Sequence, residues 1–265
     1  MVKGLYTAYS GMINEQHRMD TLTNNLANVN TTGYKKEGAT SQSFKDALAY
    51  KIKDKSVYNL TQRMGTMNPG VKIGENYNDF SEGAFRETEN TFDLALSDSG
   101  FFEIEFTDKA GNTSVKYTRD GAFTLNINGA LVTKDGDYVL DVAGNHINLD
   151  VNAGDTTIDR QGYIYQGGNM VAQIGTTDFE RNASGLDYDY LVKYGENMYE
   201  AVDGAVEVPS GASIYSGYLE QSNVSPVSEM VEMIAVTRQY EANQRIINTI
   251  NDTLEPTVNN LGRPV

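Results

Sequence analysis

The chain has 265 residues, of which 39% are hydrophobic, so it is long enough to bury a real core. It contains no cysteine, which excludes disulfides, thiolate nucleophiles and cysteine-ligated zinc. The net charge is −15, and residues 81–217 hold 23 of the 36 acidic side chains but only 8 of the 21 basic ones. Because contacts to phosphates need a basic surface, this acidic middle argues against a nucleic-acid partner.

The sequence also lacks the usual signals for a membrane. No stretch approaches the roughly 18 to 20 apolar residues that a transmembrane helix needs. The first residues, MVKGLYTAYSGMINEQH, have a lysine but no continuous apolar segment. We therefore expect no conventional secretory signal.

The first thirty residues have the period of an amphipathic helix. A row of apolar residues recurs every seven positions at Leu5, Met12, Met19 and Leu26. A second row, interrupted only by a glutamate, lies three positions further on at Ala8, Leu22 and Val29. This spacing is typical of a coiled-coil-like helix. We expect it to end at Thr31–Thr32–Gly33, with Gly33 as a left-handed C-cap.

The middle of the chain changes period. Residues 35–80 have weak periodicity and predict an extended connector, with a local helix around Phe44–Tyr50. Alternating apolar residues then predict half-buried strands at Phe123–Ile127, Tyr138–Val142 and Ile147–Val151. Residue pairs that favour hairpin turns stand at Asp120–Gly121, Asn128–Gly129, Asp135–Gly136 and Gly167–Gly168.

The C-terminal segment repeats the helical pattern of the N-terminal one. Ser225–Pro226 predicts a helix start, with Pro226 at the first helical position. The seven-residue row consists of Met233, Tyr240, Ile247, Leu254 and Leu261, and Met230, Val236 and Ile250 lie close to the second row. Pro256 is expected to end or kink this helix near its last turn.

These elements predict a mixed α and β fold. Long N- and C-terminal helices should pair as a coiled-coil-like stem beside a central antiparallel, hairpin-rich β domain. The expected domains are an N-terminal helix (1–34), an extended connector (35–80), a β domain (81–217) and a C-terminal helix (218–265). Two paired helices of this kind would still expose apolar surface, so we expect assembly into an oligomer or fibre.

The candidate chemical sites are weak. The two histidines, His17 and His146, are too few and too scattered for a histidine-ligated metal site. Glu103 and Glu105 share a strand face and superficially resemble a glycosidase pair, but a solvated acidic face explains them better. The acidic triplets Asp135–Gly136–Asp137 and Asp187–Tyr188–Asp189 lack the twelve-residue calcium loop. We therefore predict no catalytic residue, no metal, no cofactor and no enzymatic activity.

Both terminal helices are rich in amides, at Asn24, Asn25, Asn28, Asn30, Gln239, Asn243, Gln244, Asn248 and Asn251. A helix that only needed solubility would more often use Lys and Glu, which also have better helix propensity. An amide carries a donor and an acceptor, so it can pair with its own copy on a neighbouring chain. This composition favours an interface over plain solubility.

Several motifs resemble those of one family. NNLANVNTTGYKK (residues 24–36) resembles the N-terminal signature of bacterial flagellar axial proteins, through Ala27, Asn28, Thr32, Gly33, Tyr34 and Lys35. The run GYLEQSNVSPVSEMVEMIAVTRQYEANQRIINTINDTL resembles the partner signature, through Leu219, Glu220, Ser222, Asn223, Val224, Glu229, Met230, Met233, Ile234, Arg238, Tyr240, Glu241 and Asn243. SGFFEIEF, YTRDGAFTLNINGALVTKDGDYVL, DRQGYIYQGG and GENMYEA are similar to the β domain of the flagellar basal-body rod proteins.

The resemblance implies a structural subunit of the basal-body rod, with a distal position favoured over a proximal one. It implies terminal helices that form an inner tube around the export channel, and a β domain outside them. The implied partners are further copies of the chain and other flagellar rod and hook proteins, with no small-molecule substrate. Export would use the flagellar type III apparatus without a cleaved signal peptide.

The expected assembly interface combines apolar heptad residues with the amides and the turn. It comprises Leu5, Met12, Met19, Leu22, Asn24, Asn25, Leu26, Asn28, Gly33, Tyr34, Asn223, Met230, Met233, Ile234, Tyr240, Asn243, Ile247 and Leu254. The main alternative is a glycan-binding or adhesive β module that oligomerises through its helices, with stacking faces from Tyr163, Tyr165, Tyr188 and Tyr190.

Overall fold

The computed structural model describes residues 2–50, 63–150, 155–180, 188 and 190–261. The chain divides into two compact units. The first unit consists of Met1–Leu26, Glu37–Tyr77 and Pro226–Val265, and the second of the segment 27–36 together with Asn78–Ser225. The mixed α and β composition predicted from the sequence is confirmed, with a helix near each end of the chain.

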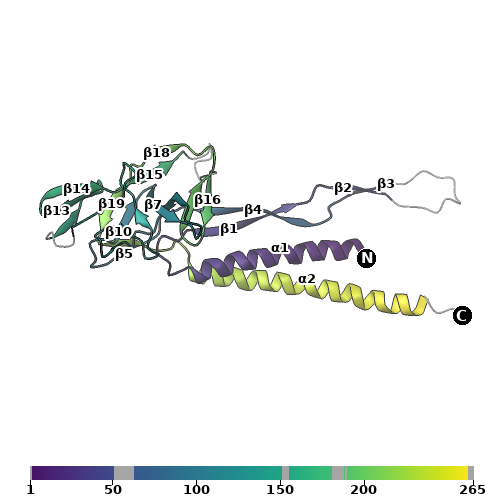
Figure 1. Ribbon diagram of the computed structural model, residues 1–265. Coiled ribbons are helices and arrows are strands. Elements are labelled where there is room, and N and C mark those ends of the chain that lie inside the picture. Colours follow the sequence, from purple (N-terminus) through teal and green to yellow (C-terminus); the bar gives the residue numbers. More distant parts are fainter. Residues whose placement is uncertain (1, 51–62, 151–154, 181–187, 189, 262–265) are drawn as a thin grey trace. The chain divides into compact units, whose positions relative to one another are not determined.

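The first unit contains the two helices and a long β ribbon. Its elements are α1 (Val2–Ala27), β1 (Lys36–Ser43), β2 (Ala47–Tyr50), β3 (Arg63–Met67), β4 (Val71–Asp79) and α2 (Pro226–Leu261). Strand β1 pairs with β4, and β2 pairs with β3, so the ribbon is two strands wide (Figure 1). The local helix predicted around Phe44–Tyr50 is wrong, because strand pairing overrides local propensity there.

Helices α1 and α2 lie side by side and run antiparallel (Figure 1). Asn25 near the end of α1 contacts Glu229 near the start of α2. At the opposite ends, Gly4 lies next to Ile250. Among the described side chains of the two helices, the buried apolar ones are Ala8, Leu22 and Val236. The pair is thus held by a narrow apolar row, and its coiled-coil geometry stays a prediction.

The helix ends differ in part from those expected. Helix α1 ends at Ala27, so Gly33 is not its C-cap. Gly33 does have a left-handed φ of 68°, but it serves a later turn where the chain passes against another segment. Helix α2 begins at Pro226, as predicted, and continues through Pro256 to Leu261 instead of ending there.

The second unit is an antiparallel β body, as predicted. Its strands are β5 (Phe85–Glu87), β6 (Leu94–Ser97), β7 (Phe101–Thr107), β8 (Thr113–Thr118), β9 (Thr124–Leu125), β10 (Leu131–Val132), β11 (Tyr138–Val139), β12 (Thr156–Ile158), β13 (Tyr163–Gln166), β14 (Asn169–Gln173), β15 (Thr176–Phe179), β16 (Leu191–Tyr194), β17 (Met198–Ala201), β18 (Glu207–Pro209), β19 (Ser213–Ser216) and β20 (Tyr218–Glu220). Among the described residues, the main sheet has nine strands. Seven follow the order β16-β17-β8-β7-β11-β10-β9, β15 pairs with β7, and β18 pairs with β15. Smaller sheets are β12-β13-β14, β19-β6 and β20-β5.

Three of the four predicted hairpin turns are confirmed. Asn128–Gly129 joins the paired strands β9 and β10, Asp135–Gly136 joins β10 and β11, and Gly167–Gly168 joins β13 and β14. Asp120–Gly121 does not form a hairpin, because β8 pairs with β7 and β17 instead of the following strand. The third predicted strand, Ile147–Val151, is wrong in its described part, because this segment forms only an isolated bridge between Asn148 and Ala130. Ile147 and Leu149 are nevertheless buried, and Val151 lies outside the described residues.

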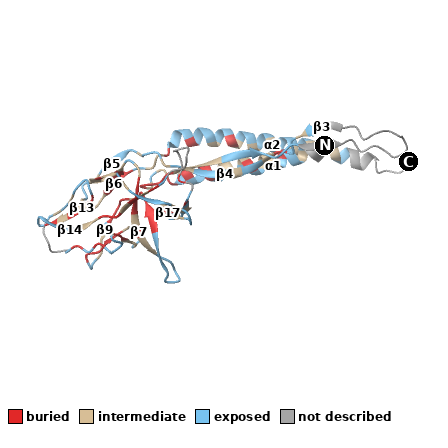
Figure 2. Cartoon of the chain, turned by 90° about the horizontal axis from the view of Figure 1, so that it is seen from above, coloured by how far each residue is buried: buried red, intermediate tan, exposed pale blue. Residues whose placement is uncertain are grey.

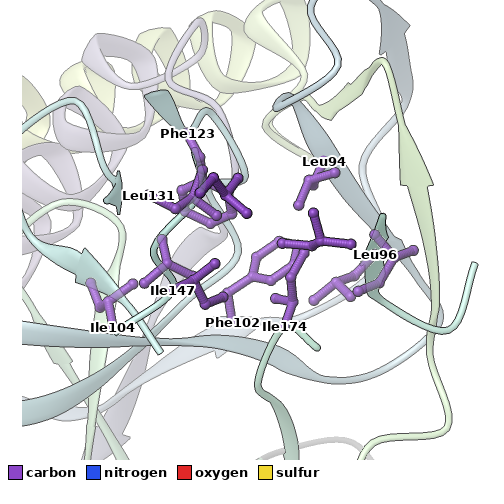
Figure 3. Close-up of a cluster of buried hydrophobic side chains, with 12 residues drawn as sticks. Leu94, Leu96, Phe102, Ile104, Phe123, Leu131, Ile147 and Ile174 are labelled. Atoms are coloured by element: carbon purple, nitrogen blue, oxygen red, sulfur yellow. The ribbon is translucent and has the colours of Figure 1, made fainter. Parts of the chain in front are cut away.

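The buried side chains concentrate in the β body, while the helices are mostly exposed (Figure 2). One apolar cluster gathers aliphatic residues around Phe102 and Phe123, whose rings meet edge to face at 5.2 Å (Figure 3). A second cluster is aromatic and consists of Phe101, Tyr117, Phe179, Tyr188, Leu191 and Tyr199. The β body therefore has a core of its own, whereas the helices bury only one narrow face.

Candidate assembly interface

Asn25 is a completely buried polar residue of the helix pair, as is its partner Glu229. Its Nδ2 donates to the Glu37 carbonyl at 2.8 Å and to the Glu229 carboxylate at 3.2 Å, and its Oδ1 accepts the Glu37 N–H at 2.9 Å. One amide thus joins α1 to the start of the ribbon and to α2. Because these partners belong to the same chain, the amide holds the first unit together rather than offering its polar atoms to a neighbour.

Further polar contacts follow the length of the helix pair. The Arg18 guanidinium lies between the carboxylates of Glu15 at 3.3 Å and Glu232 at 2.9 Å. Nearer the start of α1, the Asn243 amide rests on Gly11, where an added Cβ would lie 3.1 Å from its nitrogen. Asn243 therefore packs closely against a glycine on α1, which favours this register of the two helices.

The predicted interface residues fall into three groups. The half-buried ones on the two helices are Leu5, Met12, Met19, Leu26, Met233, Tyr240, Asn243, Ile247 and Leu254, and Leu22 and Asn25 are buried with them. The exposed ones are Asn24, Met230 and Ile234. In the second unit, Asn28, Gly33 and Tyr34 are buried and Asn223 is half-buried. Contact of these residues with neighbouring copies stays a prediction.

A buried charge cluster in the second unit was not predicted from the sequence. The Glu220 carboxylate lies 2.6 Å from Lys35 Nζ and 3.4 Å from Arg119 Nη1, and all three side chains are almost completely buried. Lys35 also donates to the Ser81 carbonyl at 2.8 Å. Two cations thus share one carboxylate inside the protein. Burial, more than the neighbouring Arg119, lowers the pKa of Lys35, while Glu220 acts against that shift.

The same cluster fastens the segment 27–36 onto the β body. The Gly33 N–H donates to the Glu220 carbonyl at 2.9 Å, and Thr32 Oγ1 donates to Asp120 at 2.6 Å. A Cβ on Gly33 would collide with the backbone nitrogen of Asp120, so no other residue fits. The Lys36 N–H donates to Asn223 at 2.8 Å. The segment that follows α1 and the one that precedes α2 are therefore joined to each other.

Large apolar side chains of the first unit stay exposed on two surfaces. One is a groove of about 580 Å³ whose apolar lining, called here the α1 groove, is Tyr6, Tyr9, Ile13, Phe44, Pro69, Val71 and Ile73. The other is a row on the first turns of α2, called here the α2 stripe, formed by Val227, Met230, Val231 and Ile234. Exposed apolar patches of this kind mark interaction sites.

The acidic residues considered as candidate chemical sites contact neighbouring side chains of the same chain. Glu103 accepts a hydrogen bond from Thr177, and burial together with the nearby Glu207 raises its pKa. Glu105 lies 3.2 Å from His146, whose ring stacks on Tyr138. Burial and the adjacent Asp135 raise the pKa of Asp137. Asp187 and Asp189, the two acidic residues of the second triplet, lie outside the described residues.

Other functional classes gain no support from the part of the chain that the structure covers. Within it, no group of three or more His, Asp or Glu side chains is placed to hold a metal ion. Neither α1 nor α2, in their described residues, combines the length and apolarity that crossing a membrane requires. His17 lies half-buried on α1.

The four tyrosines of the glycan-binding alternative do not form one stacking surface. Tyr163 and Tyr165 lie half-buried on β13, and Tyr190 is exposed. Tyr188 belongs to the aromatic core and donates to Asp178 at 2.7 Å. A residue that packs inside the core cannot offer its ring face to a sugar.

Comparison with known families gives matches in three parts of the chain. Residues 5–35 match the model described as "Flagella basal body rod protein", and residues 95–166 match "Flagellar hook protein FlgE/F/G D1 domain". Residues 215–261 match "Flagellar basal body rod FlgEFG protein C-terminal". The first and last matches contain Lys35 and Glu220, the two partners of the buried ion pair.

Full-length relatives agree with these matches. The flagellar basal-body rod protein FlgF of Caulobacter vibrioides is 31% identical over 264 residues, which cover 99% of each chain. FlgG of Bacillus subtilis is 34% identical over 98% of this chain and 99% of its own. FlgG of Borreliella burgdorferi is 32% identical over 99% and 100%. These relatives give no support to a glycan-binding or adhesive module.

Proposed function

Because this chain belongs to the FlgF/FlgG-like family of flagellar basal-body rod proteins and is a structural subunit rather than an enzyme, we propose that it polymerises through its terminal helices. The product would be a tubular axial structure that transmits torque and surrounds the export channel. The helices would form the inner wall and the acidic β body the outer layer.

The exposed apolar side chains on the paired helices support this proposal most directly. The pairing of α1 with α2 covers one face of each helix, yet the α1 groove and the α2 stripe remain open to solvent. Exposed apolar area is costly in water, and covering it with another subunit recovers about 25 cal/mol per Å². The β body buries two apolar clusters of its own, although it also exposes large apolar side chains such as Ile127, Val142 and Met170.

Within this assembly, the predicted interface residues take two roles. The exposed Met230 and Ile234 would contact neighbouring copies. The half-buried rows and Asn25 would set the helix pair that presents them. Other rod and hook proteins are the proposed partners at the two ends of the polymer. Family membership also supports export through the flagellar apparatus without a cleaved signal peptide, and the distal position in the rod stays a prediction.

Truncation tests the role of the helices. Variants that lack residues 1–26 or 226–265 retain both segments of the second unit. We expect each to keep the β circular-dichroism signal and a cooperative unfolding transition but to form no rods in negative-stain electron microscopy. Rods of normal appearance from either truncated chain would refute assembly through the helices.

A further inference from the structure

We propose that the α2 stripe of one copy docks into the α1 groove of a second copy. This inference deepens the proposed function and rests on it, because it names the two surfaces that meet when the chain polymerises. Both surfaces belong to the first unit, and they share no residue.

The α1 groove is held open by hydrogen bonds between α1 and the ribbon. Asn14 Nδ2 donates to Ser41 Oγ at 2.9 Å, and the Val71 N–H donates to Ser10 Oγ at 3.4 Å. Gly70 approaches so closely that an added Cβ would collide with the Ser10 side chain. These contacts hold the ribbon against α1 while Tyr9 and Ile13 keep their apolar surfaces exposed. The groove is therefore a formed site.

The α2 stripe has the spacing of one helix face. Val227, Met230, Val231 and Ile234 follow each other at intervals of three and four residues. This face differs from the one that α2 turns toward α1, which carries Met233 and Val236. The stripe is thus a second apolar face with no partner among the described residues of its own chain, and its shape is convex where the groove is concave.

A second copy of the chain is the occupant that fits both surfaces. A convex patch and a concave patch at different places on one molecule give a head-to-tail contact, and such contacts extend into open helical polymers.

The helix register predicts how the two copies are displaced. Asn25 meets Glu229 and Gly11 meets Asn243, so the middle of the groove lies opposite residues 244–245 of α2. The middle of the stripe, between Met230 and Val231, is about 14 residues from that point on α2, which is about 20 Å along the helix axis. Each docked copy is therefore shifted along the helix axis by about 20 Å relative to the copy that receives it.

Disulfide cross-linking of the full chain tests this contact, because the sequence has no cysteine of its own. Copies carrying Tyr9→Cys are mixed with copies carrying Ile234→Cys and oxidised under assembly conditions. Copies carrying Ile246→Cys are the matched control, since Ile246 on α2 is 49% exposed and Ile234 is 54% exposed. We expect at least about ten times more cross-linked dimer with Ile234→Cys than with Ile246→Cys.

A second pair, Ile73→Cys with Met230→Cys, repeats the test from the ribbon side of the groove. Equal yields from the stripe and control pairs, in wild-type-like assemblies, would overturn the docking contact while leaving polymerisation intact. A wild-type chain that forms no assembly would instead overturn the proposed function, and the docking contact with it. Cross-linking of Tyr9→Cys to a different rod protein, but not to Ile234→Cys, would also overturn the docking contact.

Charge insertion gives an independent measurement. Ile234→Asp should raise the critical concentration for assembly by at least about tenfold, because it places a carboxylate in an apolar groove. Ile246→Asp should change it by less than about threefold. Equal effects of the two substitutions would contradict the docking contact.

Discussion

The buried carboxylate of Glu220 offers the sharpest test of how the second unit is held together. Replacing it by glutamine keeps the shape of the side chain and its acceptor for the Gly83 N–H, which lies at 2.9 Å. The change removes the only negative charge that contacts both Lys35 and Arg119 among the described residues. Both cations then remain in the interior without the carboxylate that contacts them.

The expected cost of Glu220→Gln is about 3 to 5 kcal/mol, which is typical of removing one partner from a buried ion pair. For a unit of this size, each kcal/mol lowers the melting temperature by about 2 to 4 °C, so we expect a loss of about 10 °C. Adding Lys35→Met to Glu220→Gln should recover at least about 1 kcal/mol, because Arg119 keeps the carbonyls of Leu96 and Asp98.

Urea and thermal denaturation, followed by near-ultraviolet circular dichroism of the aromatic core, measure both variants. Glu200→Gln is the matched control, since Glu200 pairs with Lys116 at 2.9 Å but is 49% exposed. It should cost about 1 to 2 kcal/mol, less than Glu220→Gln, because water reaches the Glu200 carboxylate although Lys116 is buried. If Glu220→Gln cost no more than Glu200→Gln, the charge cluster would not be what joins the segment 27–36 to the β body.

Three further predictions concern single positions. Gly33→Ala should destabilise the second unit by more than about 2 kcal/mol in urea denaturation. Gly144→Ala, where φ is similar but the space around the glycine is open, should cost about 1 kcal/mol. Equal costs would exclude the close approach to Asp120 as the cause. Asn25→Leu should destabilise the first unit by about 2 to 3 kcal/mol, as measured by loss of helical circular dichroism on denaturation. Asn24→Leu, at an exposed position, should cost less than about 0.5 kcal/mol. The reverse order would contradict the bridging role of the Asn25 amide. Burial raises the pKa of Glu103, so the folded state holds the proton more tightly than the unfolded state does. The free energy of unfolding of the wild type, relative to that of Glu103→Gln, should therefore fall as pH rises from 4.5 through the folded pKa. A difference between the two proteins that does not change with pH would exclude Glu103 as a source of pH-dependent stability.

Local pattern was sufficient for much of the fold. The seven-residue rows predicted both helices, and Pro226 marked the start of α2 correctly because proline suits the first helical turn. The turns at Asn128–Gly129 and Asp135–Gly136 were also predictable, since these pairs favour the left-handed backbone of tight hairpins. Such features depend only on neighbouring residues.

Long-range contacts could not be predicted in the same way. Gly33 looked like a helix cap, but its left-handed backbone serves the approach to Arg119 and Asp120, more than 80 residues away. Lys35 and Glu220 each stand in a family motif, yet nothing local shows that they form one buried pair. The seven-residue period also predicted that the helices pair. Which face of α2 stays exposed could not be predicted, because it depends on where the ribbon and α1 lie.

Electron cryomicroscopy of rods assembled from the purified full chain tests the central claim most directly. We predict a tube whose wall consists of α1 and α2, with these helices in contact with those of neighbouring copies and the β bodies outside. Rods in which neighbouring copies touch only through their β bodies would contradict the account, and so would a chain that stays monomeric under assembly conditions.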